Sequence, residues 1–158
     1  MECNILLLLK QLSLALEVYG REQLKWLELS PSQVMALHYL LSRKGHSVCA
    51  TELHETFGVS KPAVSAILKG LRQKGYLELQ LSPQDDRKKQ IILTQKAYQM
   101  EPQIAASLAQ QQERVCRRVP EQQRKALESG LLTMIENLKE TQGGNRHAEN
   151  TVGTGRAV

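Results

Sequence analysis

In the middle of the chain the spacing of the apolar residues changes from a helical repeat to a strand repeat, and this change constrains the fold more than any other feature. Leu53 and Phe57, four residues apart, predict a short helix that Thr51 caps. Gly58 then provides a turn, and Ser60 caps a second helix that ends near residue 74. Its inward-facing residues are Val64, Ile67, Leu68 and Leu71. Two short helices joined in this way predict a helix-turn-helix.

After Gly75 the apolar residues alternate with polar ones, at Leu77, Leu79 and Leu81, which predicts a strand buried on one face. Residues 91–93 (Ile-Ile-Leu) predict the return strand. The connection over residues 82–89 is too long for a tight turn and too charged to be buried. We therefore expect a hairpin that projects as a wing.

Long helices are predicted on both sides of this unit. Residues 1–29 form an N-terminal dimerisation helix, and Ser30 and Gln33 form a capping box for a further helix. Thr94 caps a long helix, and Pro120 separates it from a last one, so residues 95–140 supply C-terminal dimerisation helices. Residues 30–94 are then the winged helix-turn-helix domain, and residues 141–158, poor in aliphatic side chains, are expected to be a disordered tail.

The fold class predicted is mainly α with a small β-hairpin wing. Hydrophobic residues make up 41% of the chain and aromatic residues only 4%, which favours helix packing over a β-sandwich. The broad apolar stripes of the flanking helices exceed what so small a unit buries, so we expect a homodimer. Its two-fold axis would place two recognition helices about 34 Å apart on a pseudo-palindromic site.

The positive charge is concentrated in one segment. Residues 60–90 contain seven basic and three acidic residues, so most of the net charge of +5 lies in the second helix and the wing. A helix-turn-helix followed by a basic hairpin is typical of duplex-DNA readers, because the second helix fits the major groove and the wing reaches the neighbouring groove or backbone.

The motifs of residues 24–94, and the order of elements over residues 4–140, resemble the MarR family of bacterial winged-helix regulators. The stretches that carry the resemblance are Phe57-Gly58-Val59-Ser60-Lys61, Leu71-Arg72-Gln73-Lys74-Gly75-Tyr76, and Asp85-Asp86-Arg87 followed by Leu93-Thr94. The family's wing signature has Arg where this chain has Asp86, and its members often carry Arg at the place of Ala66 and near Gly70. The resemblance implies a regulator that usually represses genes and often releases DNA in response to a small aromatic or anionic ligand or an oxidant.

DNA contacts are expected from the start and outer face of the second helix and from the wing. The resemblance implies that Arg87 enters the minor groove and that Asp85 orients it. The candidate contact residues are Ser60, Lys61, Pro62, Ala63, Ser65, Lys69, Asp85, Arg87, Lys88 and Lys89. The alternative for the helix residues is an ordinary solvated face.

The resemblance also implies an effector pocket between the first helix and the winged helix-turn-helix domain. The candidate lining residues are Tyr19, Trp26, Met35, His38 and Tyr39. The alternative is that these aromatic residues belong to the core.

Metal and redox roles are weakly indicated. His38, His46, Cys49 and His54 are too loosely spaced to predict a shared metal ion, and neither a metal nor a cofactor is expected. Cys3, near a helix start, is a candidate oxidant sensor because a helix dipole favours a thiolate, and an inert thiol is the alternative. The other thiols have no pairing pattern, and the apolar run near the N-terminus is too short for a membrane span, so a cytoplasmic location is expected.

The function predicted is a sequence-specific, ligand- or redox-responsive transcriptional repressor that binds double-stranded DNA. The alternative is a winged-helix module that binds protein or RNA without an operator. The chain has no glycine-rich phosphate loop, metalloprotease motif or nucleophile elbow, so an enzyme is not expected.

Overall fold

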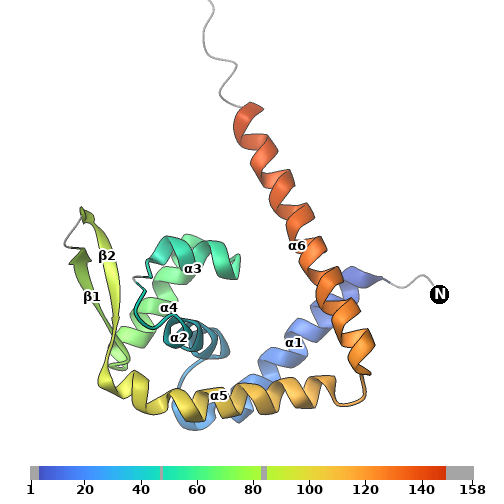
Figure 1. The fold of residues 1–158 in the computed structure, drawn as a ribbon, viewed down its shortest axis with the longest axis horizontal. Helices are drawn as coiled ribbons and strands as arrows, with labels where there is room; N and C mark the ends of the chain where they lie inside the picture. Colours follow the sequence, from blue (N-terminus) through green and yellow to red (C-terminus); the bar gives the residue numbers. More distant parts are fainter. Residues whose placement is uncertain (1–3, 47, 83–84, 149–158) are drawn as a thin grey trace, which may run out of the picture. The chain divides into compact units, whose positions relative to one another are not determined.

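The computed structural model describes residues 4–46, 48–82 and 85–148, with side chains except at positions 82, 85–88 and 140–148. The elements follow in the order α1 (Ile5–Gln23), η1 (Lys25–Leu27), α2 (Pro31–Ser42), α3 (Ala50–Phe57), α4 (Lys61–Gln73), β1 (Leu77–Ser82), β2 (Asp85–Leu93), α5 (Gln95–Cys116) and α6 (Glu121–Ala148) (Figure 1). The predicted fold class, mainly α with one β-hairpin, is confirmed. The chain divides into two compact units, Met1–Gln112 and Glu113–Val158.

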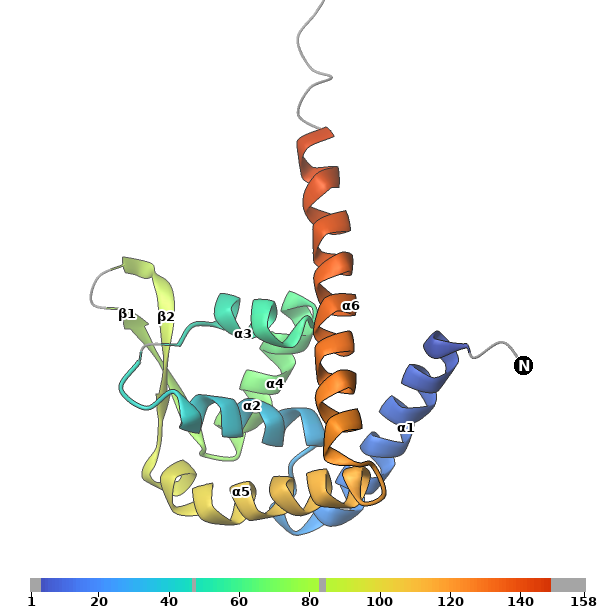
Figure 2. The ribbon, with the colours of Figure 1, turned by 45° about the vertical axis from the view of Figure 1, so that its right-hand side comes forward.

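The hydrophobic core of the first unit lies where α2, α3 and the hairpin surround α4. Helix α4 contacts α2, α3 and β1, and Figure 2 shows it passing behind α2. The largest fully buried side chains are Leu24, Val34, Leu37, Leu41, Leu53, Leu71, Leu77 and Ile104. The recognition element is therefore held on several sides, because its apolar stripe faces a common core.

The N-terminal helix is shorter than predicted. It was expected to continue to Leu29, but α1 ends at Gln23 and the 3₁₀ turn η1 follows. Leu27 and Leu29 are both buried. On a straight helix these two positions would lie about 200° apart, so both reach the core only if the helix ends before them. Glu28, between them, takes a left-handed conformation with φ of 53°.

The N-caps of α2, α3 and α4 agree with the sequence predictions with one exception. The predicted capping box of α2 is present: Ser30 Oγ accepts from Gln33 N, and Gln33 Oε1 accepts from Ser30 N at 3.0 Å. Ser60 caps α4, as predicted, by accepting from Ala63 N. The prediction that Thr51 caps α3 is wrong, because the extended residue at this end is Cys49 and Thr51 lies in the first turn.

The hairpin begins and ends where its apolar residues predict, but its second strand is longer. Leu77 pairs with Leu93 and Leu79 with Ile91, whereas β2 already starts at Asp85 instead of residue 91. A two-stranded ladder continues through polar residues because the backbone hydrogen bonds need no buried face. The apolar alternation therefore marks only the buried part of the strand.

Contacts of Thr94 and Lys96 hold the start of α5 against the base of the hairpin. Thr94 Oγ1 donates to the Gly75 carbonyl at 2.6 Å, and Thr94 N donates to the Tyr76 carbonyl. The Lys96 ammonium lies 4.4 Å from the centroid of the Tyr76 ring. Burial, with a smaller contribution from the charge of Glu28, raises the pKa of the Tyr76 phenol. Tyr76 therefore packs as a neutral phenol where the base of the hairpin meets α5.

The C-terminal helix extends beyond its predicted end. Disorder was expected from Thr141, but α6 continues to Ala148; residues 149–158 of the predicted tail lie outside the described residues. Once a helix is nucleated, each further residue adds a backbone hydrogen bond, so helix continues without an apolar face. Over the described residues, none of the helices has the length and apolarity that crossing a membrane requires.

Candidate nucleic-acid interface

Helix α4 presents one buried and one exposed face. Val64, Leu68 and Leu71 are buried against the core. The candidate residues of the helix start and outer face lie on the other side, with Ala63 half-buried and the rest exposed: Ser60, Lys61, Pro62, Ser65 and Lys69. Because the apolar stripe anchors the helix, its polar face stands free for a partner.

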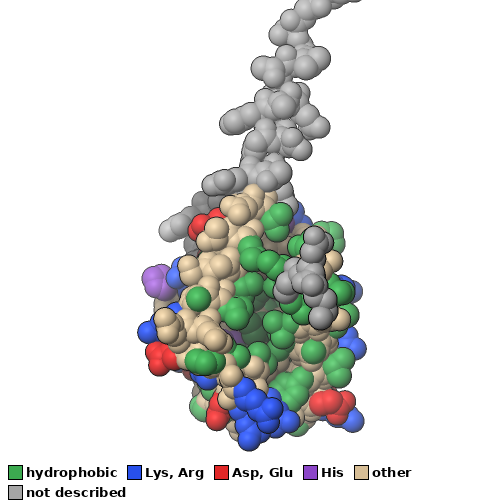
Figure 3. Space-filling model, turned by 90° about the vertical axis from the view of Figure 1, so that its right-hand side faces the viewer, with side chains coloured by type: hydrophobic (Ala, Val, Ile, Leu, Met, Phe, Trp, Pro, Cys, Tyr) green, Lys and Arg blue, Asp and Glu red, His purple; other side chains and the backbone are tan. Residues whose placement is uncertain are grey.

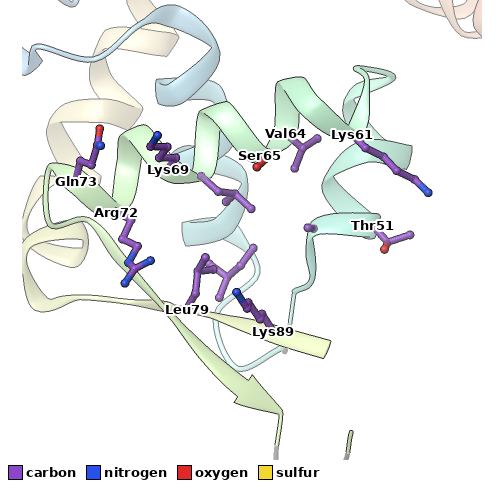
Figure 4. A pocket seen from close by; sticks show the side chains of 12 residues that line it. Thr51, Lys61, Val64, Ser65, Lys69, Arg72, Gln73, Leu79 and Lys89 are labelled. Atoms are coloured by element: carbon purple, nitrogen blue, oxygen red, sulfur yellow. The ribbon is translucent and has the colours of Figure 1, made fainter. Parts of the chain in front are cut away.

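A cleft of about 620 Å³ separates this face from the hairpin. Its apolar surface comes from Val64 and Leu68 of α4 and from Leu79 and Ile91, which pair across the hairpin. Four cationic side chains also line it: Lys61, Lys69, Arg72 and Lys89. Figure 4 shows Arg72 and Lys89 approaching the cleft from helix and hairpin, with Leu79 between them. No acidic residue is among the described residues that line the cleft.

Arg72 is a cleft residue that the sequence reasoning did not select. It is exposed and lies one helical turn after Lys69 and two turns after Ser65. The spacing of four and then three residues places all three side chains on one face. This spacing is visible in the sequence and is the signal that would have identified Arg72.

The wing candidates are only partly visible. Lys89 is exposed on β2, where it pairs with Leu81 across the hairpin. Asp85, Arg87 and Lys88 also lie on β2, but their side chains are outside the described part of the structure. That Asp85 orients Arg87 therefore stays a prediction.

Polar and aromatic contacts fix the first helix of the helix-turn-helix. Tyr39 Oη donates to Glu52 Oε1 at 2.7 Å, and the Tyr39 and Phe57 rings meet edge to face at 5.6 Å. His54 Nδ1 contacts the carbonyl of Val59 in the turn. These contacts join α2 to α3 and α3 to the start of α4, so they hold the recognition helix in place.

The candidate effector residues lie around the junction of α1, η1 and α2, but in different environments. Trp26 and Met35 are about half exposed, at 51% and 47%, whereas Tyr19 is half-buried. Tyr39 points to α3 through its bond to Glu52. His38 has a buried Nδ1 atom without a hydrogen-bond partner. The structure therefore gives Tyr39 a packing contact, and leaves Trp26 and Met35 accessible.

The thiols and histidines form no cluster in the part that the structure describes. No group of three or more His, Cys, Asp or Glu side chains with metal-binding geometry occurs there. Cys49 and Cys116 are free and half-buried, and Cys3 lies outside the described residues.

Comparison with known proteins bears on both the winged helix-turn-helix and the whole fold. Residues 27–88 match a family model described as MarR family. No curated protein matches the chain. Solved structures match the fold over most of its length. The transcriptional regulator SlyA is 19% identical, with a TM-score of 0.80 over 88% of this chain and 96% of its own.

Two further matches are DNA complexes. MepR of S. aureus bound to DNA is 18% identical, with a TM-score of 0.81 over 87% of this chain and 99% of its own. A MarR family transcriptional regulator from Listeria monocytogenes, complexed with 26mer DNA, is 17% identical, with a TM-score of 0.80 over 99% of both chains. The helix-turn-helix, hairpin and flanking helices match these structures, so the fold is that of a winged helix-turn-helix protein, and residues 27–88 are similar to the MarR family.

Proposed function

We propose that the protein is a sequence-specific transcriptional regulator that binds double-stranded DNA in the cytoplasm. The observation that carries this proposal is the cationic face formed by α4 and the hairpin. Lys61, Lys69, Arg72 and Lys89 surround one cleft there. Such a face matches the charge of a phosphate backbone, and a helix of this size fits the major groove.

The contacts divide into two kinds. Lys61, Lys69 and the wing residues supply charge for phosphates, which fixes position and gives affinity. Ser65 and the small residues Pro62 and Ala63 allow α4 to lie close to the base edges, where sequence is read. The DNA complexes of MepR and of the Listeria regulator support this use of the fold.

The regulator acts as a homodimer in this proposal. Helix α1 exposes large hydrophobic side chains on both sides, among them Leu6 at 78% and Val18 at 66%. In α6 the exposed apolar residues are Leu127, Leu132, Met134, Ile135 and Leu138. Figure 3 shows hydrophobic side chains gathered on the face it views. So much exposed apolar surface favours burial against a second copy, which would give a two-fold reader for a pseudo-palindromic site.

Repression relieved by a small effector is the mode of regulation that we propose. The support is local: Trp26 and Met35 are accessible at the junction of α1, η1 and α2, and His38, also on α2, has a buried Nδ1 atom without a hydrogen-bond partner among the described residues. A ligand there would contact elements that position the reader. The redox role of Cys3 remains a prediction from the sequence.

The test is binding of the purified protein to the DNA upstream of its own gene, measured by fluorescence anisotropy over a salt series. We expect tight binding that weakens steeply with salt, and a shallower salt slope, by about one ion, for Lys69→Gln. Lys25→Gln, which removes an exposed charge in η1, is the matched control and should leave the slope unchanged. Equal affinity for upstream DNA and for scrambled DNA would overturn the proposal of sequence-specific binding. Preferential binding of RNA would support the alternative, a winged-helix module that binds RNA.

A further inference from the structure

The first turn of α4 carries proposed DNA contacts, but burial does not hold it in place. Lys61 and Pro62 are exposed and Ala63 is half-buried, whereas the buried stripe of the helix begins at Val64. The stripe fixes the body of α4 against the core, and the turn before it depends on local hydrogen bonds. Whatever fixes this first turn therefore decides where its side chains lie on DNA.

The connection between α3 and α4 contains a glycine that gives the backbone freedom. Gly58 has φ of 62°, in the left-handed region, and no side chain restricts its rotation. Two hydrogen bonds surround it. Gly58 N donates to the His54 carbonyl at 3.0 Å, and the ring nitrogen Nδ1 of His54 bonds to the Val59 carbonyl. The second of these bonds reaches across the glycine, so it joins α3 to the chain that enters α4.

The Val59 carbonyl belongs to the peptide unit that leads into Ser60, the N-cap of α4. A carbonyl oxygen accepts and cannot donate, so the neutral His54 ring carries its proton on Nδ1 and donates it. Because a peptide unit is planar, fixing the direction of its carbonyl also fixes the direction of the Ser60 N–H. Ser60 Oγ then accepts from Ala63 N, which completes the first turn. The His54 ring is thus the side chain that connects α3 to this turn.

We propose that His54 is a positioning residue for sequence reading: its Nδ1 bond to Val59 transfers the fixed position of α3 to the first turn of α4. Helix α3 is a fixed reference because Leu53 is buried and Glu52 accepts from Tyr39 Oη at 2.7 Å. This inference rests on the proposed DNA binding.

The expected effect is on specificity, because the two kinds of DNA contact differ in tolerance. Hydrogen bonds to base edges form over a range of only about 0.5 Å, so a small displacement of the first turn breaks them. Long lysine side chains still reach phosphates after such a displacement. Loss of the His54 bond should therefore lower the affinity for the operator and leave the affinity for DNA of other sequence unchanged.

Two substitutions of His54 separate this hydrogen bond from the rest of the side chain. In His54→Asn the amide nitrogen is attached to Cγ, as Nδ1 is, and can donate to Val59. In His54→Gln the amide lies one bond further from the backbone. Glutamine is the better helix former of the two, so a defect confined to His54→Gln cannot come from a weakened α3.

The experiment is fluorescence anisotropy with operator and scrambled DNA at fixed salt. We expect His54→Asn to keep the parental operator affinity and His54→Gln to lose about ten-fold, the loss expected for one base contact. The affinity for scrambled DNA should stay parental in both. His46→Gln, an exposed histidine outside this turn, is the matched control and should change neither affinity.

Three results would overturn the proposal: parental operator affinity in His54→Gln, equal losses in the Asn and Gln variants, or a parallel loss for operator and scrambled DNA. Circular dichroism of both variants checks that they are folded. If a variant is unfolded, the decision passes to the parent protein, whose ring ¹⁵N NMR signals at about pH 9, where histidine is neutral, report the position of the proton. A proton on Nδ1 supports the bond, and a proton on Nε2 overturns it.

Hydrogen exchange of the Ala63 amide, which donates to Ser60 Oγ, gives a readout without DNA. We expect faster exchange in His54→Gln than in the parent and parental exchange in His54→Asn. Equal exchange in all three would overturn the link between α3 and α4. A parent that binds operator and scrambled DNA equally would overturn the proposed function instead, so the two failures are distinguishable.

Discussion

At the scale of single residues, Gly70 shows how closely the reader is packed. A Cβ atom at this position would lie 2.0 Å from Gln33 Nε2, the side chain that completes the capping box of α2. Gly70 is therefore one reason why α2 and α4 approach each other as they do.

The prediction is a coupling between Gly70 and Gln33. In the parent, Gly70→Ala gains about 1 kcal/mol of helix propensity but displaces the Gln33 side chain, so we expect little net change in the free energy of unfolding. In a Gln33→Ala background the same substitution should stabilise by about 1 kcal/mol. Urea unfolding of the four variants measures the difference. Equal effects in both backgrounds would show that the contact has no energetic weight.

A second residue-scale prediction concerns the N-terminus of α3. Cys49 has the extended conformation of a cap, with φ of −113° and ψ of 166°, but its side chain makes no capping hydrogen bond. Cys49→Ser supplies a hydroxyl of similar size and should stabilise by about 0.5–1 kcal/mol, seen in thermal or urea unfolding. Thr51→Ser is the control and should have little effect. A larger gain in stability from Thr51→Ser than from Cys49→Ser would indicate that Thr51, not Cys49, is the N-cap of α3.

At the scale of elements, the sequence predicts what is built from local signals. The caps at Ser30 and Ser60, the turn at Gly58 and the pairing of Leu77 with Leu93 follow from residue types and spacing. The end of α1 cannot be predicted from local signals, because it depends on burying Leu27 and Leu29 in a core made by distant residues. The start of β2 cannot be predicted in this way either, because its first residues are polar and show no alternation of apolar and polar side chains.

The candidate site divides in the same way. The outer face of α4 is predictable from helical spacing, and Arg72 was missed although it obeys that spacing. The cleft itself was not predictable. It requires Leu79 and Ile91 of the hairpin to lie beside Leu68, a contact between elements that no local pattern encodes.

The wing is the element with the most direct functional test. Arg87→Ala should weaken operator binding by about 1–3 kcal/mol while the fold stays intact, and Asp85→Ala should weaken it less. Asp86→Arg, which restores the residue of the family signature, should strengthen binding to operator and scrambled DNA alike and steepen the salt dependence. Anisotropy over a salt series measures all three. An Arg87→Ala variant that binds like the parent at every salt concentration would remove the wing from the interface.

At the scale of the whole molecule, the exposed apolar surface has to be covered for the protein to remain soluble. On α1, Leu7, Leu14 and Val18 form one exposed stripe and Ile5, Leu8 and Leu12 another, at different angles around the helix. A single neighbouring helix covers only one stripe. We therefore expect α1 to lie between two elements in the proposed dimer, so that dimer formation and folding of this region would be coupled.

The last prediction tests whether this assembly is required for function. Ile135, on α6, is 49% exposed although it belongs to an apolar stripe. Ile135→Glu places a charge in the proposed dimer interface, where no described contact of the monomer depends on the isoleucine, so the helix-turn-helix should remain folded. We expect sedimentation equilibrium to show a monomer at low micromolar concentration and operator affinity to fall by a hundred-fold or more, because one reader holds only one half-site. Glu136→Gln, an exposed neighbour on the same helix, is the matched control and should stay dimeric. An Ile135→Glu dimer with parental affinity would place the interface elsewhere, and a monomer with parental affinity would show that one chain suffices to read the operator.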